Sequence, residues 1–247
     1  MADAASDASL ADADTEAQAD AAPDSDASPP PPPPPTYYGV SFDRGSLERV
    51  EAPYQAGMAG AAALTVEGWF LLRQPTDEGH LFQFHGGNCS YAGSAGYGVM
   101  QGHLNCLVKL NGGGVTAQVF SQQLLTLGKW FHVAFVLRNG VWTLFLNGQT
   151  QGTAVADYGP TLPGVIPFEA RKFKVGGTGT AANETIDGVV DEFRASLSAD
   201  YVADFVPPAH LAAAGSPSLA LDEGAGLVVG AGSGSLVGGS SWTTVVR

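Results

Sequence analysis

Residues 130–148 read WFHVAFVLRNGVWTLFLNG, and this stretch decides the fold. Two runs rich in β-branched and aromatic residues flank the pair Asn139-Gly140, and the pair Asn147-Gly148 leads into a third run. Asn-Gly pairs accept the positive φ angles that two-residue type I′ hairpin turns require. The stretch therefore predicts a β-meander of three strands, which we place at Trp130–Arg138, Val141–Leu146 and Gln149–Val155.

Strand signals continue upstream of the meander. Further apolar runs of strand composition are Thr65–Leu72, His80–Phe84 and Asn105–Leu110, whereas helical patterning is nearly absent. The chain also holds 33 glycines, and turn signals recur at regular intervals. Short strands with frequent turns favour a β-sandwich or jelly roll over alternating strands and helices. We therefore predict an all-β fold.

Composition divides the chain near residue 36. Residues 1–35 are almost entirely Ala, Asp, Ser and Pro, with eight acidic residues, no Lys or Arg, and no aromatic residue. Such a segment cannot bury enough apolar surface to offset its backbone entropy. We expect residues 1–35 to be a disordered acidic tether, in which Pro29–Pro35 forms a polyproline II spacer of roughly 20 Å. Residues 36–247 then form one domain.

The charge of the chain bears on its partners. The net charge is −13, and eight of the 24 acidic residues lie in the tether. The other 16 acids oppose 11 basic residues, which leaves a net charge of −5 on the folded part. A nucleic-acid partner requires a basic surface, so we expect none. The same acidity disfavours electrostatic binding to an anionic membrane.

Membrane and targeting signals are sparse. No run of about 18 apolar residues occurs, so we expect no transmembrane segment. The first residues lack the basic and apolar pattern of a signal peptide, which leaves a cytosolic protein or a mature secreted one. The acidic, Ser- and Pro-rich leader resembles the stalk of a bacterial surface lipoprotein. We favour a secreted, periplasmic or cell-surface location, with lipid anchoring through a segment upstream of residue 1.

The chain has two cysteines, Cys89 and Cys106. Their separation is too wide for a CxxC metal or redox motif. We favour one disulfide between neighbouring strands, which would indicate an oxidising compartment. Two buried free thiols are the alternative.

Four segments, in this order along the chain, resemble the laminin-G-like jelly-roll family of concanavalin A-like lectin and glucanase domains. They read VSFDRG and RVEAP within residues 40–53, LTVEGWF at 64–70, WFHVAF and WTLFLNG within 130–148, and GVVDEFR at 188–194. Two departures are Gly68, where the family usually has Ala, and Arg44 inside the first turn. The resemblance implies an antiparallel two-sheet jelly roll that is usually non-catalytic, binds glycans or proteins, and often holds one calcium ion.

Some proteins on this fold are glucanases, which use a pair of carboxylates for catalysis. A retaining pair of carboxylates must sit about 5 Å apart, and on a strand only residues i and i+2 are close on one face. Residues 36–247 contain no Glu-x-Asp cluster. Asp187 and Asp191 share a strand face but lie about 13 Å apart at about 3.3 Å per residue. We therefore expect no enzymatic activity.

Calcium is the metal ion that the resemblance implies. A hard cation prefers carboxylate and carbonyl oxygens. Asp43 lies in the first turn and Asp191 in a late strand, and in this fold the first and last strands commonly neighbour each other. These two residues are our candidate ligands for one structural calcium ion. Alternatively, Asp43 caps a turn and Asp191 pairs with Arg194 or a backbone amide.

Candidate ligand-binding residues lie in two predicted loops. Glycan sites usually combine an exposed aromatic residue with polar groups from loops. The loop Gly86–Tyr97 carries three candidates, and a second loop begins beside a fourth. The candidates are Asn88, Tyr91, Tyr97 and Tyr158. Each tyrosine could instead cover the core or a sheet edge.

Function follows chiefly from the resemblance and from the lack of a carboxylate cluster. The leading hypothesis is a non-catalytic extracellular or cell-surface binding module whose partner is a glycan or an extracellular protein. One alternative is a structural or adhesive domain of a surface lipoprotein that has no small ligand. Another is a carbohydrate-binding domain accessory to a separate hydrolase.

Overall fold

The computed structural model describes a set of segments within the unit Pro35–Arg247. These segments are residues 37–44, 47–52, 61–75, 78–84, 87–91, 93, 101–109, 115–156, 173–178, 184–209, 219–222, 226–229, 235–237 and 241–245. The expected disordered tether, residues 1–35, lies outside them.

Sixteen strands form in the described segments, and none of these segments contains an α-helix. The first eight are β1 Tyr37–Phe42, β2 Arg49–Ala52, β3 Ala63–Leu72, β4 Gly79–Phe84, β5 Gly87–Tyr91, β6 Leu104–Lys109, β7 Val115–Phe120 and β8 Trp130–Arg138. The others are β9 Val141–Leu146, β10 Gln149–Val155, β11 Phe173–Val175, β12 Gly188–Ser196, β13 Leu219–Asp222, β14 Gly226–Val229, β15 Ser235–Val237 and β16 Ser241–Val245.

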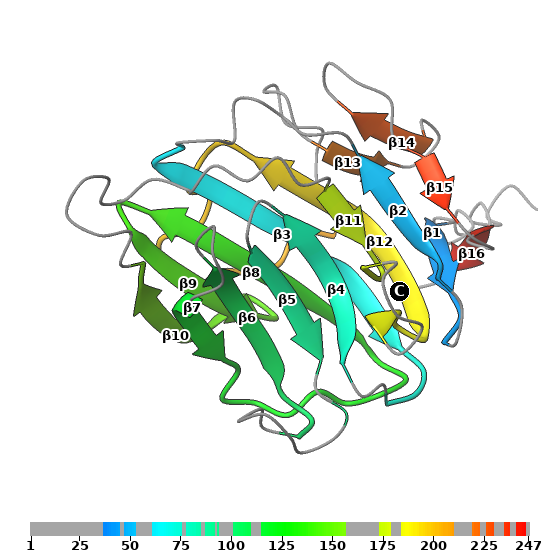
Figure 1. Ribbon diagram of the computed structural model, residues 1–247, viewed down its shortest axis with the longest axis horizontal. Helices are drawn as coiled ribbons and strands as arrows, with labels where there is room; N and C mark the ends of the chain where they lie inside the picture. The colour runs from blue at the N-terminus through cyan, green and yellow to red at the C-terminus, as the bar shows by residue number, and fades with distance from the viewer. Residues whose placement is uncertain are drawn as a thin grey trace, which may run out of the picture. The chain divides into compact units, whose positions relative to one another are not determined.

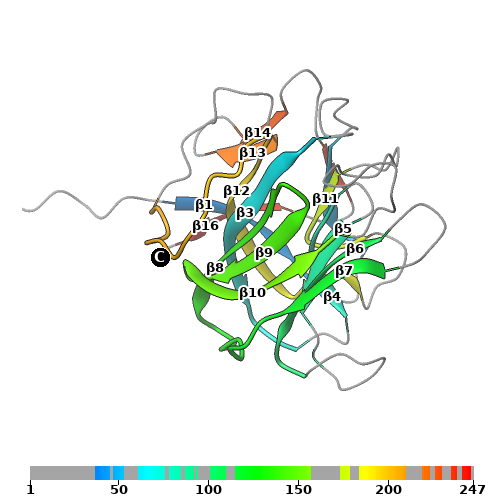
Figure 2. The same ribbon diagram turned by 90° about the vertical axis from the view of Figure 1, so that its left-hand side faces the viewer.

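The strands form two antiparallel sheets that face each other (Figures 1 and 2). The nine-stranded sheet has the order β10-β9-β8-β3-β12-β1-β16, and β13 and β14 continue from β12 as a branch. The seven-stranded sheet has the order β15-β2-β11-β4-β5-β6-β7. The predicted all-β, two-sheet antiparallel sandwich is therefore confirmed.

The space between the sheets is filled by large apolar side chains. Phe70 from one sheet lies 6.2 Å, ring centre to ring centre, from Phe82 of the other, and Phe135 stacks on Trp142 at 4.5 Å. The largest fully buried side chains in this space are Trp142, Phe42, Phe70, Phe82, Phe84, Phe135 and Phe193. Each fully buried side chain of this size contributes about 1.5–3 kcal/mol of hydrophobic free energy, so this core is the main stabilising element.

The predicted meander forms with the predicted bounds, as β8, β9 and β10. Both turns have the expected backbone, since Asn139 and Asn147 have φ angles of 49° and 51° and are each followed by a glycine with positive φ. Gly148 is required for a second reason. A Cβ atom there would lie 1.9 Å from the carbonyl oxygen of Phe205.

The expectation of a loop over Gly86–Tyr97 is wrong in its first half, because Gly87–Tyr91 forms strand β5 between β4 and β6. Gly87 lacks a side chain, and the ring of Phe84 fills that space at 2.5 Å from where a Cβ atom would stand. Cys89 lies directly opposite Cys106 in the β5–β6 register, and the two form a disulfide. The favoured pairing is therefore confirmed.

A β-bulge interrupts β12. Asp191 pairs with Trp69 but Arg194 pairs with Glu67, so β12 holds one residue more than β3 in this interval. Glu192 accommodates the extra residue with a φ angle of 52°. The bulge turns Phe193 into the core and places Arg194 on the outer face, beside Glu67. Because of this extra residue, side chains do not alternate strictly between the two faces from Asp191 to Arg194.

Candidate functional site

The outer face of the seven-stranded sheet carries a line of side-chain amides. Along β4 to β7 the residues alternate in direction, and one set fills the core while the other points outward. Three outward residues occupy matching positions on β4, β5 and β7, and we call them the amide row. The amide row consists of Gln83, Asn88 and Gln118.

Strand register places these amides in one line with charged groups at one end. Glu51 of β2 is opposite Lys174 of β11, and Lys174 is opposite Gln83. The line continues through Asn88 and the apolar Leu107 to Gln118 on the edge strand β7. Six positions at about 4.8 Å per strand give a line of about 24 Å.

A second line runs beside the first and adds an aromatic side chain. Ser90, Asn105 and Phe120 occupy matching positions on β5, β6 and β7. Phe120 is half-buried and lies on the outer face. The amide nitrogen of Gln118 donates to the side-chain oxygen of Asn105 at 3.0 Å, which fixes the orientation of both amides.

Asn88, at the centre of the line, has an incomplete hydrogen-bond set. Its side-chain oxygen is buried and accepts no hydrogen bond. A buried acceptor without a partner costs about 1–3 kcal/mol, so such groups usually accept from a ligand or a water molecule. Amides offer both donors and acceptors, which is the chemistry that vicinal hydroxyl groups require.

Two of the four sequence-predicted ligand residues, Asn88 and Tyr91, lie in the described segments, and they face opposite sides of β5. Asn88 faces outward, but Tyr91 faces the core and is 5% exposed, and burial raises the pKa of its hydroxyl. Tyr97 and Tyr158 lie outside the described residues. Sequence reasoning missed Gln83 and Gln118, because only strand register shows that they align with Asn88.

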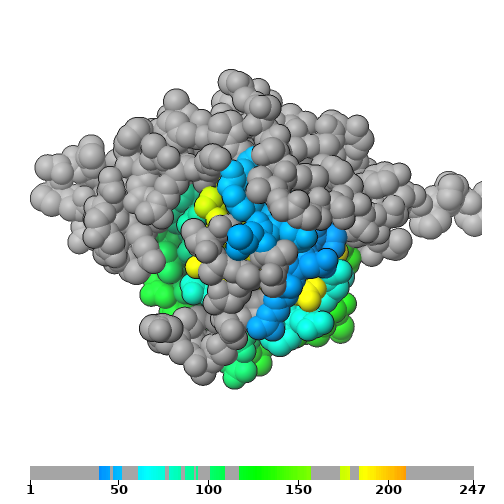
Figure 3. Space-filling model, turned by 45° about the vertical axis from the view of Figure 1, so that its right-hand side comes forward, coloured from blue at the N-terminus to red at the C-terminus, as the bar shows by residue number. Residues whose placement is uncertain are grey.

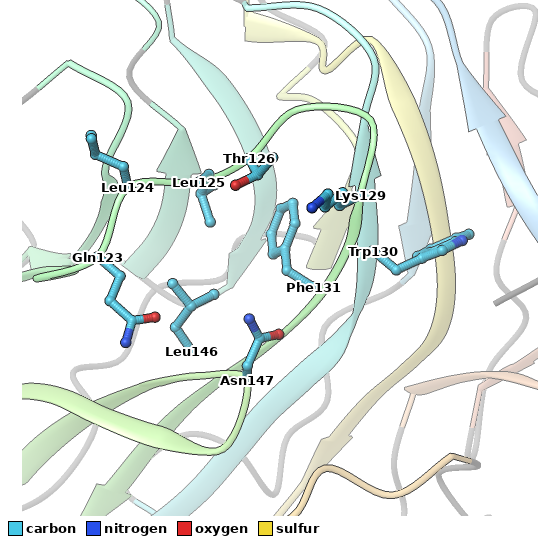
Figure 4. Close-up of a pocket in the computed structure, with 9 residues that line it drawn as sticks. All are labelled: Gln123, Leu124, Leu125, Thr126, Lys129, Trp130, Phe131, Leu146 and Asn147. Carbon is cyan, nitrogen blue, oxygen red and sulfur yellow. The ribbon is translucent and has the colours of Figure 1, made fainter.

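A small recess lies at one end of the sandwich, between the segment before β8 and the β9–β10 turn (Figure 4). Its volume is about 180 Å³, below the roughly 300–1,000 Å³ of typical small-molecule sites. In Figure 4 the side chains of Leu146 and Asn147 extend toward Leu125 and Phe131 across this recess, and that of Gln123 extends toward Leu146. The oxygen of Asn147 accepts the backbone N–H of His132 at 2.9 Å.

A wider recess of about 670 Å³ adjoins the first and shares Asn147 with it. Its wall includes Gln149 and Asp204. Asp204 accepts the backbone N–H and the hydroxyl of Thr150, at 2.8 and 2.7 Å, and these hydrogen bonds lower the pKa of Asp204. The carboxylate therefore links the segment around Asp204 to strand β10.

The proposed calcium ligands do not converge. β1 and β12 are neighbours, as expected, but their register places Asp43 four residues beyond the partner of Asp191, or about 13 Å along the strand. Asp191 is buried, whereas Asp43 is exposed and lies 3.3 Å from the guanidinium of Arg73. Within the described segments no three His, Cys, Asp or Glu side chains form a metal-binding group. Calcium stays a prediction.

The outer face of the nine-stranded sheet holds a buried charged cluster that the sequence analysis missed. Glu67 is fully buried and accepts hydrogen bonds from Arg194 and from the hydroxyl of Tyr201, and it lies 3.3 Å from His132. Burial alone would raise the pKa of Glu67. The contact with His132 and the charge of Arg194 outweigh it, so the pKa is lowered.

Residues 197–209, which we call the strap, lie over this cluster. Asp200 of the strap pairs with Arg194 at 3.0 Å, and Tyr201 stacks on Phe205 with ring centres 3.6 Å apart. The indole of Trp69 donates to the carbonyl of Pro208 at 3.1 Å. A glutamate inside an otherwise apolar strand is the one sequence signal that could have indicated the cluster.

The fold is a jelly-roll sandwich. The strap covers the outer face of the nine-stranded sheet, and the amide row lies on the outer face of the seven-stranded sheet. The chain belongs to the concanavalin A-like lectin/glucanase superfamily, whose profile matches residues 45–203. No curated protein matches the sequence. No helix in the described segments is long and apolar enough to cross a membrane.

Solved structures agree on the fold. A heptameric SAP-like pentraxin from Limulus polyphemus matches with a TM-score of 0.53 at 15% identity, over 84% of this chain and 94% of that one. A putative carbohydrate-binding protein from Bacteroides ovatus matches with a TM-score of 0.52 at 15% identity, over 67% of this chain and 45% of that one. At such identities these likenesses show the fold alone.

Proposed function

We propose that this chain is a non-catalytic binding module that holds a glycan on the outer face of the seven-stranded sheet. The observation that carries the proposal is the amide row, which strand register places in one outward-facing line across the sheet. The row presents donors and acceptors on a rigid sheet, so little conformational entropy is lost when a ligand binds.

The chemistry of this face favours a neutral, hydroxyl-rich ligand. Gln83, Asn88 and Gln118 carry no charge, and the nearby Phe120 offers an apolar ring against which the C–H face of a sugar can pack. The line is long enough to contact several sugar units. The net charge of −5 on the folded part disfavours a polyanionic glycan.

Membership of a superfamily named for lectins supports a binding role, and the solved structure from Bacteroides ovatus carries the description of a putative carbohydrate-binding protein. The disulfide supports an oxidising compartment and hence a secreted, periplasmic or cell-surface location. An acidic tether that spaces the domain from a lipid anchor fits such a location. The ligand-free structural role and the role as an accessory of a hydrolase are the competing functions.

The test is a glycan array probed with the full chain, followed by calorimetric titration of the best neutral oligosaccharide. We expect Asn88→Ala and Gln118→Ala each to weaken binding about fivefold to tenfold, the value of one hydrogen bond. Gln149→Ala is the matched control, because Gln149 is an exposed amide in the wider end recess. It should bind like the unmodified chain.

The outcomes separate the hypotheses. Loss of binding in Gln149→Ala, with no effect at Asn88 and Gln118, would move the site to the end recess and overturn the amide row. Failure of the unmodified chain to bind any glycan would favour the structural or adhesive role. Equal binding by all three variants would show that these amides do not contact the ligand.

A further inference from the structure

Arg73 follows β3 directly, at the end of the sheet where β1 finishes and β12 begins. On the face shown in Figure 3, blue residues from the first described segments lie beside cyan and yellow residues from later ones. The Arg73 side chain crosses the start of β12 and reaches the end of β1. It thereby connects three neighbouring strands of the nine-stranded sheet.

Five oxygen atoms surround the guanidinium. Nε of Arg73 donates to the carboxylate of Asp187 at 2.8 Å. One terminal nitrogen, Nη2, lies within 3.3 Å of four further oxygens from β1, the turn after it and β12. These are Ser41 Oγ at 3.1 Å, the Phe42 carbonyl at 2.7 Å, Asp43 Oδ1 at 3.3 Å and the Gly188 carbonyl at 3.2 Å.

The number of acceptors exceeds what this nitrogen can satisfy. A terminal guanidinium nitrogen carries two N–H groups, so it cannot donate a good hydrogen bond to four oxygens at once. A spherical cation has no such restriction. Two carboxylates, two backbone carbonyls and a hydroxyl are also the oxygen types that calcium selects.

We infer that the guanidinium of Arg73 is the resident cation of an oxygen cradle, formed by Ser41, Phe42, Asp43, Asp187 and Gly188, that would otherwise suit a divalent ion. The positive charge locks β1, β3 and β12 together at their common end. The structure of this chain is then independent of calcium. A jelly roll of this kind can therefore hold its sheet end with a covalently attached cation in place of a bound one.

Accessibility makes the inference testable. The side chain of Arg73 is 41% exposed and that of Asp43 is 77% exposed, so an ion can enter when the guanidinium is removed. Two carboxylates on a partly exposed site predict weak calcium affinity, on the order of 0.1–1 mM as in extracellular modules. Magnesium demands a smaller octahedral site and should bind less well.

The experiment measures thermal unfolding of the full chain and its Arg73→Ala variant in chelator, in calcium and in magnesium. We expect the unmodified chain to show the same Tm in all three. Arg73→Ala should unfold at a lower Tm in chelator and gain about 3–5 °C at a calcium concentration ten times its Kd. Adding Asp43→Asn to Arg73→Ala should reduce the calcium response.

Two results would overturn the inference: an equal calcium response in the unmodified chain, or no calcium response in folded Arg73→Ala. If Arg73→Ala does not fold, Arg73→Lys and Arg73→Gln decide. The lysine keeps the charge and should retain more of the Tm than the neutral glutamine. Equal loss in both variants would show that the cation itself is not required.

Discussion

The two outer faces of the sandwich use polar residues in opposite ways. On the nine-stranded sheet the strap covers Glu67, whose carboxylate accepts hydrogen bonds from Arg194 and from Tyr201 inside the protein. On the seven-stranded sheet the amide row stays partly exposed, and the oxygen of Asn88 has no partner. The difference teaches that the chain itself covers one face, whereas the other face is the one that the proposed function leaves open to a ligand.

The largest expected effect lies on the covered face. Glu67→Ala leaves the guanidinium of Arg194 and the hydroxyl of Tyr201 without their buried acceptor. Breaking a buried ion pair by removing one partner costs about 3–5 kcal/mol, so the urea midpoint should fall sharply. Gln83→Ala on the other face should change stability by less than about 0.5 kcal/mol. Similar losses in both variants would remove the distinction between the faces.

The second prediction concerns the disulfide that joins β5 and β6, the two central strands beneath the amide row. Cys89 and Cys106 are 17 residues apart, and closing a loop of about this length stabilises a protein by about 3 kcal/mol. Reductant in the denaturant series should lower stability by that amount. The variant Cys89→Ala with Cys106→Ala should start at the lower value and not respond to reductant. An unchanged midpoint after verified reduction would show that sheet packing alone holds β5 and β6 together.

The strap itself is tested at Phe205. This ring stacks on Tyr201 and meets the edges of Phe145 and His132, with ring centres 5.4 and 5.8 Å away. Complete burial would make Phe205→Ala cost about 3–5 kcal/mol, and half-burial reduces this to about 2 kcal/mol. Hydrogen exchange should also become faster at the backbone amides around Glu67. Protection equal to that of the unmodified chain would mean that the strap does not depend on this ring.

Acid should weaken the covered face first. The pKa of Glu67 is lower in the folded protein than its ordinary value of 4.5, so near that pH the unfolded chain binds the proton more readily. The contribution of Glu67 is therefore present above about pH 4.5 and is lost as pH falls through the folded pKa. Denaturation series between pH 7 and pH 3 should show a shallower loss in Glu67→Gln, which cannot titrate at this position. Parallel curves would contradict the assigned shift.

Local sequence signals sufficed for part of this structure. The Asn-Gly turns fix the meander because each turn depends only on its own two residues. Strand β5 was not predicted, because Gly87 suits a strand only where the ring of Phe84 fills the space above it. Asp43 and Asp191 were grouped on strand adjacency, which is correct, but their separation depends on a register that the sequence does not encode locally.

The same reason applies to the candidate site. Gln83, Asn88 and Gln118 are spread over 36 residues and align only through three successive strand pairings, from β4 to β7. The partners of Glu67 required the β12 bulge, which brings Arg194 to the outer face. Both polar arrangements therefore depend on pairing between strands that are distant in the sequence. No single polar residue predicts either arrangement by itself.

A small expected effect on stability is also the sharpest test of the comparison. Gln118 is exposed, and its one described side-chain hydrogen bond is to Asn105, so Gln118→Ala should lower the free energy of unfolding by about 1 kcal/mol or less, the net value of one hydrogen bond. The same variant should lose glycan affinity, whereas a strap variant should lose stability and keep its affinity once folded. These opposite effects are expected if the amide row binds a ligand and the strap stabilises the fold. Loss of stability without loss of affinity in Gln118→Ala would instead make the row part of the scaffold, because its amides would then be satisfied within the sheet.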